Sequence, residues 1–554
     1  MKFETKAAQG WIAAAGSAAD WLPATLLVGV TGAIVAGGHD ALAYILGFAG
    51  ALFLWATVLT PGMAGSDSAR GITSFLAGRY RSPAVGKLAS AVLLLALVIL
   101  LAAEITAAAR AYAALGTTTG HISAALATVP FALGAIVLLA ARSGSLSMHV
   151  GATLAALAFA ILIGAVAWLA YIDGPGALIS VPAMSEIATL EQGLLEKRLA
   201  DPATFKPYAV PFLRTDPLNF SALIVCVSLG LAILATPSRP SRPSTISRAV
   251  LFVTAALIML PPVAAAAKRS LLALFASGVR PVALPDWMTS FQTTGALEIC
   301  GSSSSDPIVL AKACGKGVGP QGFMRWHDAA FAQDALVFAG LDAASMTIDL
   351  MSLTICSATV ALTVWTARRI AILSEAALFP DGEPGTASFR TAFMLPVLLT
   401  LAALIAAARP ADSATLLAWS ATLAAAGLAP ALLTALVVLN PGRAAASVAI
   451  PFGALFTLAI ILASRYAPID VFALTSSLSN APPAVVRKLA SLQDTLAAAT
   501  PGPGRDTLLL QAEKLARDNL AWFGLKPLAA GIFGLAAGAL IMAAGSVVSA
   551  LSRR

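Results

Sequence analysis

Three carboxylates stand inside apolar stretches of this sequence, where an ionised side chain finds little water. Asp342 and Asp349 lie in the run DALVFAGLDAASMTIDLMSLTICSATVAL, and Glu104 lies in the apolar run 84–112. A charge at membrane depth costs at least about 2.5 kcal/mol and usually faces a cavity or a partner. These positions therefore indicate cation or proton traffic, with solvation near the outer interface as the alternative for Asp342.

The two aspartates are seven residues apart, which places them near one face of a continuous helix. Ser345 and Thr347 lie between them. Oxygen-rich positions with carboxylates suit a hard cation such as Na⁺ better than a soft metal. The sequence has no nucleophile elbow, phosphate-binding loop, zinc motif or cysteine–histidine cluster, so it predicts neither an enzyme nor a cofactor beyond Na⁺ or H⁺ as coupling ion.

The composition is that of a polytopic membrane protein, because 58% of the 554 residues are hydrophobic and only 11% are charged, against about 25% charged in soluble domains. The net charge of +8 comes from Lys and Arg at the ends of apolar runs. Their distribution predicts a bacterial-type inner-membrane protein with both termini cytoplasmic. No basic run with interleaved aromatic residues occurs, so lipid is expected as a partner and nucleic acid is not.

About twelve apolar runs are long enough to cross a membrane. A short amphipathic helix is predicted at 71–82, and long outer loops at 173–216, 269–330 and 464–525, with one or two helices in 480–518. The runs are 19–38, 41–60, 84–112, 122–141, 147–172, 217–236, 249–268, 331–366, 391–408, 414–439, 447–463 and 526–550.

Cys300 and Cys314 share the outer loop 269–330. A disulfide is allowed there because the loop faces an oxidising compartment, and two free thiols are the alternative. Cys226 and Cys356 lie in apolar runs.

Two of the apolar runs are interrupted. The run 19–38 opens with Asp20 and Pro23, and the run 217–236 contains Gly230. A proline frees backbone carbonyls, which are tolerated at membrane depth only inside protein or beside a water-filled cavity. Two interrupted spans five helices apart indicate an inverted repeat with a binding site at the midplane. Ordinary packing of small residues between helices is the alternative.

Several stretches resemble one family. AADWLPATLLVGVTGAIVAGGHDALAYILGFAG at 18–50 resembles the first core helix of the sodium:solute symporter family, in its acetate and short-chain monocarboxylate permease branch. The segments 71–80, 284–295 and 519–538 resemble its first inner loop, an outer loop and its final helix. The similarity is collinear over almost the whole chain. The family's extra N-terminal helix, before the first core helix, is expected to be absent.

The resemblance implies an all-α membrane protein of the leucine-transporter type, with two inverted five-helix repeats and about 12 transmembrane helices. It implies this division: 1–18, a cytoplasmic N-terminus; 19–172, the first repeat; 173–216, an outer loop; 217–439, the second repeat with the outer loop 269–330; and 440–554, two C-terminal spans with the outer loop 464–525.

The resemblance also implies a sodium site between core helices one and eight. The family has a second Ser or Thr after the helix-eight hydroxyl, whereas this sequence has Ile348. Asp349 would replace the lost ligand only if the helix is locally distorted, because its side chain points about 100° further round. The carried-over ligands are the carbonyls of Ala19, Leu22 and Ala344 and the hydroxyl of Thr347.

The predicted substrate and gating positions are Thr25 and Gly230, which lie in runs that correspond to the family's, together with Gly29 within the first run and the deep carboxylate Glu104. The polar runs of the family are altered here to Pro-Ala-Thr-Leu-Leu at 23–27 and GLAILATP at 230–237. The sequence thus predicts a Na⁺- or H⁺-coupled symporter of a small organic anion, such as acetate. The alternative is a non-transporting family member that acts as a sensor or as a subunit of an unidentified partner protein.

Overall fold

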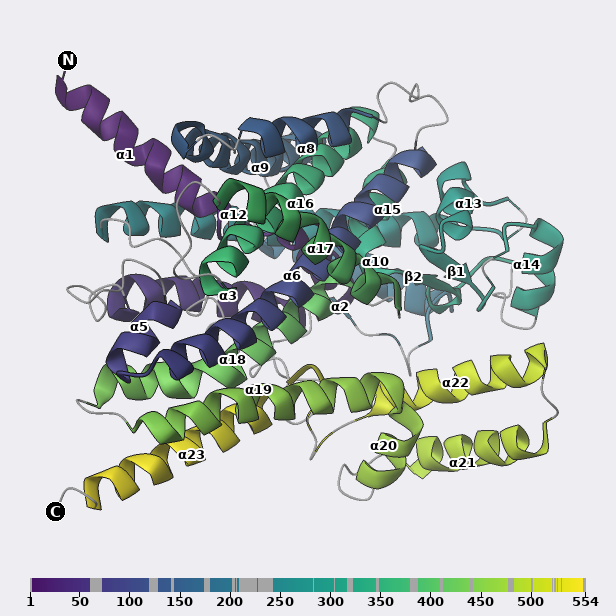
Figure 1. Cartoon of the computed structure of the whole chain (residues 1–554). Coiled ribbons are helices and arrows are strands. Elements are labelled where there is room, and N and C mark those ends of the chain that lie inside the picture. Colours follow the sequence, from purple (N-terminus) through teal and green to yellow (C-terminus); the bar gives the residue numbers. More distant parts are fainter. Residues whose placement is uncertain are drawn as a thin grey trace. The chain divides into compact units, whose positions relative to one another are not determined.

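The structure is a computed structural model, and the chain is almost entirely helical in its described part (Figure 1). A two-stranded antiparallel sheet is the exception among these residues. The structure describes residues 2–59, 72–118, 128–140, 144–173, 180–201, 205, 207–208, 227, 243–281, 283–302, 304–315, 322–344, 348–378, 387–408, 412–438, 442–476, 483–499, 502–520, 522, 525, 527–529 and 531–551.

Six of the described helices are long and apolar enough to cross a membrane. Shorter apolar helices accompany them, and the expected span 217–236 lies outside the described residues, apart from residue 227. The six are α6 (Pro83–Thr118), α12 (Pro243–Ser277), α16 (Ile348–Leu378), α18 (Ser413–Val437), α19 (Arg443–Tyr466) and α23 (Gly531–Leu551). The shorter apolar segments include 129–139 of α8 (Val129–Ala140), 149–164 of α9 (Gly144–Asp173) and 394–407 of α17 (Ala387–Ala408).

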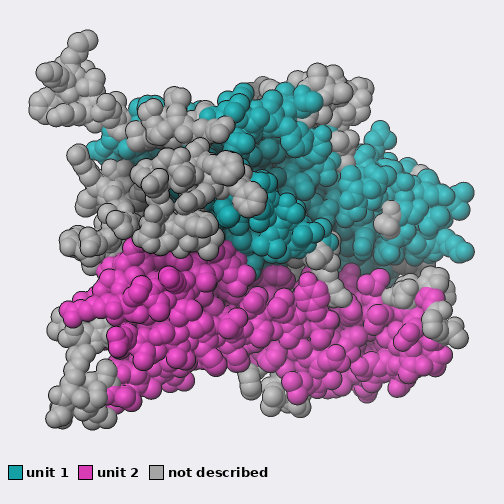
Figure 2. Space-filling model, viewed as in Figure 1, with its two compact units in different colours: residues 1–61, 97–218, 238–417 teal, residues 62–96, 219–237, 418–554 magenta. Residues whose placement is uncertain are grey.

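The chain divides into two compact units (Figure 2). Unit 1 comprises Met1–Pro61, Leu97–Leu218 and Ser238–Leu417, and unit 2 comprises Gly62–Ala96, Asn219–Pro237 and Ala418–Arg554. Helices α6 and α18 contribute residues to both units.

The first apolar run of unit 1 is a broken helix that begins earlier than the sequence predicts. Helix α1 (Lys2–Ala19) covers most of the expected N-terminal segment 1–18. It packs on α9 and α12. The helix stops at Asp20–Pro23, because Pro23 has no N–H to donate back to Ala19. The chain continues as η1 (Leu26–Val30), α2 (Thr31–Gly37), η2 (Gly38–Ala41), α3 (Leu42–Leu54) and η3 (Trp55–Leu59).

The expected single span 331–366 is also two helices. It starts with η8 (Gln333–Ala335) and α15 (Leu336–Ala343), and α16 begins only at Ile348. The prediction that Asp342 and Asp349 share one continuous helical face is therefore wrong, because α15 ends between them.

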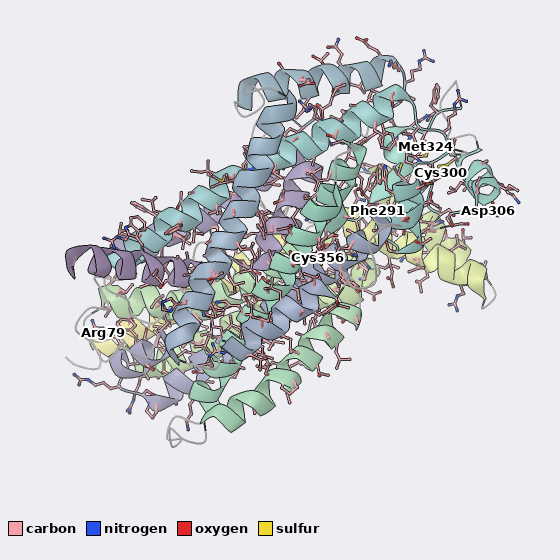
Figure 3. All side chains as sticks on the ribbon, turned by 90° about the horizontal axis from the view of Figure 1, so that it is seen from above. Arg79, Phe291, Cys300, Asp306, Met324 and Cys356 are labelled. Atoms are coloured by element: carbon pink, nitrogen blue, oxygen red, sulfur yellow. A yellow bond between two sulfur atoms is a disulfide. The ribbon has the colours of Figure 1, made fainter. Side chains whose placement is uncertain are left out.

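The connections of unit 1 hold small elements: α10 (Ser180–Glu196), α13 (Asp286–Thr293), β1 (Leu297–Ile299), α14 (Pro307–Cys314), η7 (Trp326–Asp328) and β2 (Ala329–Phe331). In the sheet, Leu297 lies opposite Phe331. In the structure a disulfide joins Cys300 to Cys314, which is one of the two alternatives that the sequence leaves open (Figure 3).

Alkylation of the denatured, unreduced protein is expected to modify only Cys226 and Cys356 of the four cysteines, and all four after reduction. The bond closes a loop with a sequence separation of 14, which stabilises a folded domain by about 3 kcal/mol. The mass of the intact alkylated protein measures the number of modified thiols. Four modified thiols without reductant would contradict the assignment.

Unit 2 packs its helices through small residues. A Cβ added to Gly453 of α19 would meet the carbonyl of Ala426, and one added to Gly534 of α23 would meet Thr457 and the carbonyl of Gly453. Such close backbone approach is typical of helix pairs in membranes. Gly453 and Gly534 therefore allow α19 and α23 to pack closely on their neighbouring helices.

The predicted short helices of unit 2 are present. Helix α5 (Ile72–Arg79) ends on Arg79, whose guanidinium donates to the carbonyls of Ala435 and Val438 at 2.7 and 3.1 Å. These donors satisfy carbonyls at the end of α18.

The loop 464–525 contains α20 (Pro468–Thr475), α21 (Pro483–Ala498) and α22 (Pro503–Asn519), which share a small apolar core around Phe472 and Leu489. The α21–α22 pair confirms the helices predicted in 480–518.

Candidate functional site

The break in the first helix is held by a carboxylate from α6. Glu104 is fully buried. Its Oε2 accepts the Ala24 N–H at 2.8 Å, and its Oε1 accepts the Thr25 hydroxyl at 2.9 Å and, weakly, the Thr25 N–H at 3.5 Å. The first N–H groups of a helix have no partner within the helix, and a negative charge is favourable beside them. Glu104 thus caps the second half of the broken helix.

The structure brings together two of the four residues predicted for substrate or gating, Thr25 and Glu104. Helix α16 contacts the same part of α6, because the Thr363 hydroxyl donates to the backbone carbonyl of Glu104 at 3.3 Å. Thr25 and Thr363 are both buried. The capped helix start is therefore a polar cluster enclosed by apolar helices.

The other side of the break is held by α16. Arg369 Nη1 donates to the Asp20 carbonyl at 2.6 Å, and Arg369 Nε lies 3.8 Å from Asp20 Oδ1. The Trp365 indole N–H donates to Asp20 Oδ1 at 3.1 Å. A cation is favourable at the carboxyl end of a helix such as α1. The two halves of the broken helix thus meet opposite charges, Arg369 at the end of α1 and Glu104 at the start of the second half.

In the described part of the structure, the predicted sodium ligands do not all lie at one place. Ala19 and Leu22 are buried at the break, but the residues of α16 that reach it are Thr363, Trp365 and Arg369. Helical rise separates Trp365 from Ile348, the first residue of α16, by about 25 Å.

Ala344 immediately follows α15, which packs on α12 where a Cβ on Gly340 would meet Ala267. Thr347, Gly230 and the side chain of Asp349 lie outside the described residues. The sodium site therefore stays a prediction.

Gly29 lies at a second junction of unit 1. A Cβ at this position would meet the Ser413 hydroxyl, the Ala414 nitrogen at 3.0 Å and Asp334 Oδ1 at 3.2 Å. Asp334 is buried and caps α18, accepting the Ser413 N–H at 2.9 Å and the Ser413 hydroxyl at 2.8 Å. The glycine thus permits close packing of η1 on the start of α18, and its predicted gating role is not tested by this contact.

Sequence reasoning missed Arg369 and Asp334. Arg368 and Arg369 directly follow the apolar run 331–366, and the positive-inside rule treats such arginines as residues of an inner loop. For Asp334, the pair Asp412-Ser413 before an apolar run is a helix-start signal, but it does not reveal that a second carboxylate supplies the cap.

The fold matches solved structures, although no protein-family profile and no curated protein sequence matches the chain. One match is described as the substrate-bound, outward-open state of a Na⁺-coupled sialic acid symporter with a novel Na⁺ site. The TM-score is 0.52 at 12% sequence identity, and the match covers 96% of this chain and 88% of that chain. It confirms the predicted fold class, an all-α membrane protein with a symporter fold. The division into repeats at 19–172 and 217–439 stays a prediction.

Proposed function

We propose that the chain is a secondary active transporter that couples inward movement of a cation, Na⁺ or H⁺, to symport of a small organic anion. The observation that carries the proposal is a broken first helix capped by the buried Glu104, in a chain with the fold of a Na⁺-coupled symporter. Discontinuous helices with half-helix N-termini at the midplane are the usual binding elements of such folds.

The capped helix start suggests how solute and cation could be linked. The N–H groups of Ala24 and Thr25 form the positive end of a helix, where a carboxylate ligand binds well. Glu104 holds these donors in the present conformation. A cation or proton that neutralises Glu104 would free them for the carboxylate of the solute. A short monocarboxylate such as acetate is the solute that the altered, apolar surroundings favour.

Uptake of radiolabelled acetate into proteoliposomes tests the proposal. It is measured with an inward Na⁺ gradient, with a proton gradient and with neither. Accumulation driven by either gradient supports symport and identifies the coupling ion. No accumulation of acetate or of a panel of small organic anions under any gradient would contradict it. We place the protein in a bacterial-type inner membrane with both termini cytoplasmic, which labelling of single terminal cysteines added to a cysteine-free variant would check.

One observation favours the second candidate, a non-transporting sensor or partner subunit. The Asp20 carbonyl is occupied by the Arg369 guanidinium, a fixed cation that holds the break without a mobile ion. In a protein that has lost coupling, such a contact would keep the two halves in one arrangement.

Replacing Arg369 by Gln is expected to make the melting temperature sensitive to Na⁺. Loss of the guanidinium leaves the Asp20 carbonyl without its charged donor, which costs about 1–2 kcal/mol for this partly exposed contact. Na⁺ would then restore part of the stability by binding to the native state. Melting in NaCl is compared with melting in choline chloride, for this variant and for Arg443→Gln, an exposed arginine of α19. Equal melting temperatures of the Arg369 variant in both salts would exclude a cation-accepting break.

A further inference from the structure

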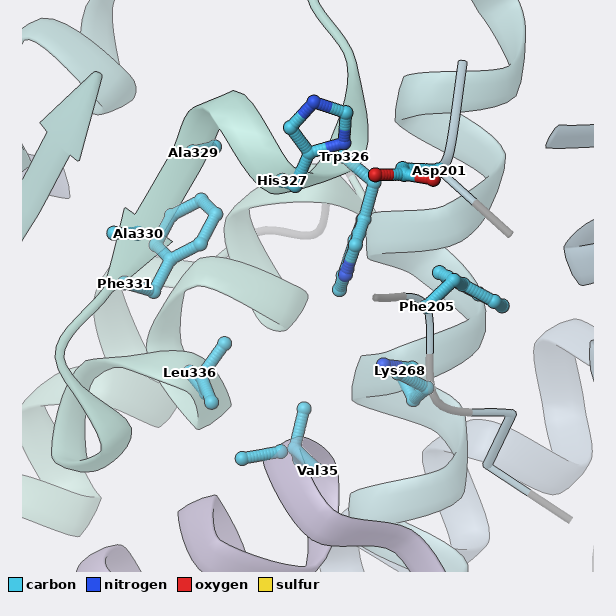
Figure 4. Close-up of a pocket in the computed structure, with 11 residues that line it drawn as sticks. Val35, Asp201, Phe205, Lys268, Trp326, His327, Ala329, Ala330, Phe331 and Leu336 are labelled. Carbon is cyan, nitrogen blue, oxygen red and sulfur yellow. The ribbon is translucent and has the colours of Figure 1, made fainter. Parts of the chain in front are cut away.

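A cavity of about 350 Å³ lies in unit 1, away from the break (Figure 4). Its lining includes Val35 of α2, Lys268 of α12, Trp326 and Phe331 of the η7–β2 segment and Leu336 of α15, together with Asp201 and Phe205 of the connection after α10. Helical rise places Val35 about 15 Å along the first helix from Thr25. The cavity is therefore distinct from the capped helix start.

Lys268 is the buried charge of this cavity. The residue is 3% exposed, and its ammonium lies 4.4 Å from the centre of the Trp326 ring. Among the described residues, no acceptor forms a hydrogen bond with this ammonium, and no carboxylate is close enough for an ion pair. An ammonium at the wall of a largely apolar cavity, without hydrogen-bond acceptors from the protein, is poorly solvated, so an acceptor supplied by a ligand would stabilise it.

Glu191 of α10 is the carboxylate that interacts electrostatically with Lys268 from a longer distance. Its Oε1 already accepts the Tyr208 N–H at 2.8 Å. Burial raises the pKa of Glu191, although the Tyr208 N–H and Lys268 oppose the shift. Glu191 is thus an incomplete counter-ion, which leaves the ammonium available to a ligand.

Two hydrogen-bond donors meet at the Lys268 end of the cavity. Figure 4 shows the indole nitrogen of Trp326 at the end of the ring that points towards Lys268. No described residue accepts a hydrogen bond from this indole N–H. Val35, Phe331 and Leu336 supply apolar walls. Two donors at one end of an apolar cavity fit a carboxylate head with an apolar chain, and the volume is in the range of small-molecule sites.

We propose that this cavity binds an organic carboxylate with an apolar chain, of about the size of hexanoate, through the Lys268 ammonium and the Trp326 indole N–H. The site goes beyond the proposed transport function, because it lies outside the break. Its lining includes Val35 of α2, so an occupant would contact the second half of the broken helix.

A ligand with a positive head group is the competing possibility. Asp201 and His327 also line the cavity, and His327 Nε2 lies 3.5 Å from Asp328 Oδ1. Figure 4 shows Asp201 and His327 near the backbone end of Trp326. An alkylammonium probe tests whether this acidic side of the cavity determines binding.

Equilibrium dialysis of radiolabelled hexanoate against the purified full chain in detergent, without any ion gradient, tests the proposal. Lys268→Met keeps the length of the side chain without its charge, and it is expected to weaken binding at least about tenfold. The matched control is Lys312→Met, an exposed lysine of α14, which should bind hexanoate as the wild type does.

A second variant is needed in case Lys268→Met does not fold, which the melting temperature of Lys268→Met would reveal. Trp326→Phe keeps an aromatic ring over Lys268 but removes the indole N–H, and it is expected to weaken binding by about threefold to tenfold. Equal affinity of wild type and both folded variants would overturn the proposal, as would no saturable binding to the wild type. Tighter binding of hexylammonium than of hexanoate would overturn it in favour of a cation site. Acetate uptake is a separate assay, so either proposal can fail alone.

Discussion

Glu104→Ala is expected to lower the free energy of unfolding by about 3–5 kcal/mol. The truncation removes the acceptor of the Ala24 N–H and of the Thr25 hydroxyl, and both donors stay in a fully buried place. A buried donor without a partner retains its whole desolvation cost, which is about 1–3 kcal/mol for each group. Unfolding in mixed micelles, followed by circular dichroism, measures the change.

Two variants separate the cap from a general effect of losing a glutamate. Glu104→Gln keeps one acceptor oxygen and is expected to lose less than half as much stability as Glu104→Ala. Glu298→Ala, at an exposed position of β1, should stay within about 0.5 kcal/mol of the wild type. If Glu104→Ala unfolds as the wild type does, the carboxylate does not hold the helix start in the protein.

The same variants distinguish a structural cap from a coupling group. If Glu104 only caps the helix, Glu104→Gln should still accumulate solute at a temperature where it is folded. If the carboxylate exchanges a proton or cation, Glu104→Gln should lose gradient-driven accumulation while it stays folded. Proteoliposome uptake at a temperature below both melting points provides this comparison.

Features that depend on local composition were predictable from the sequence. Hydropathy identified the membrane class, Pro23 identified the break in the first helix, and the pattern at 71–82 identified α5. The pairing of Cys300 with Cys314 was an option because both lie in one loop. Each of these rests on residues that lie within one short stretch of the chain.

The start of α1 and the end of α15 were not predictable in the same way. The segment KFETKAAQG is too polar for a search that looks for apolar runs, yet Ala, Lys, Glu and Gln are good helix formers. Helix α15 ends at Ala343 without a proline or glycine next to it, so no residue type marks the second break.

The contacts that hold the site are distant in the chain. Glu104 is 80 residues from Ala24, and Trp365 is 345 residues from Asp20. A single sequence shows that Glu104 lies in an apolar run and that hydrogen-bond donors or a counter-ion must offset the desolvation of its carboxylate. It does not show which donors bind the carboxylate, because the identity of the donors depends on how the helices pack.

Gly32→Ala is expected to destabilise the protein by about 1–3 kcal/mol, although alanine favours an isolated helix by about 1 kcal/mol. A Cβ at Gly32 of α2 would meet the backbone carbonyl of Gln333 in η8, with the carbonyl carbon at 3.0 Å and the Asp334 Cα at 3.6 Å. A backbone group cannot rotate away as a flexible side chain can, so α2 or η8 must shift.

Gly50→Ala is the matched control, because this glycine of α3 is exposed and a Cβ there meets no atom within 4 Å. The two substitutions make the same chemical change in helices of one unit, so the sign of the stability change separates packing from helix propensity. Melting temperatures in detergent should fall for Gly32→Ala and stay the same or rise for Gly50→Ala. A shift between α2 and η8 would also displace the start of α15, which η8 leads into, so solute uptake should fall in Gly32→Ala alone. Equal stability of the two variants would mean that α2 does not pack on η8 as closely as the structure shows.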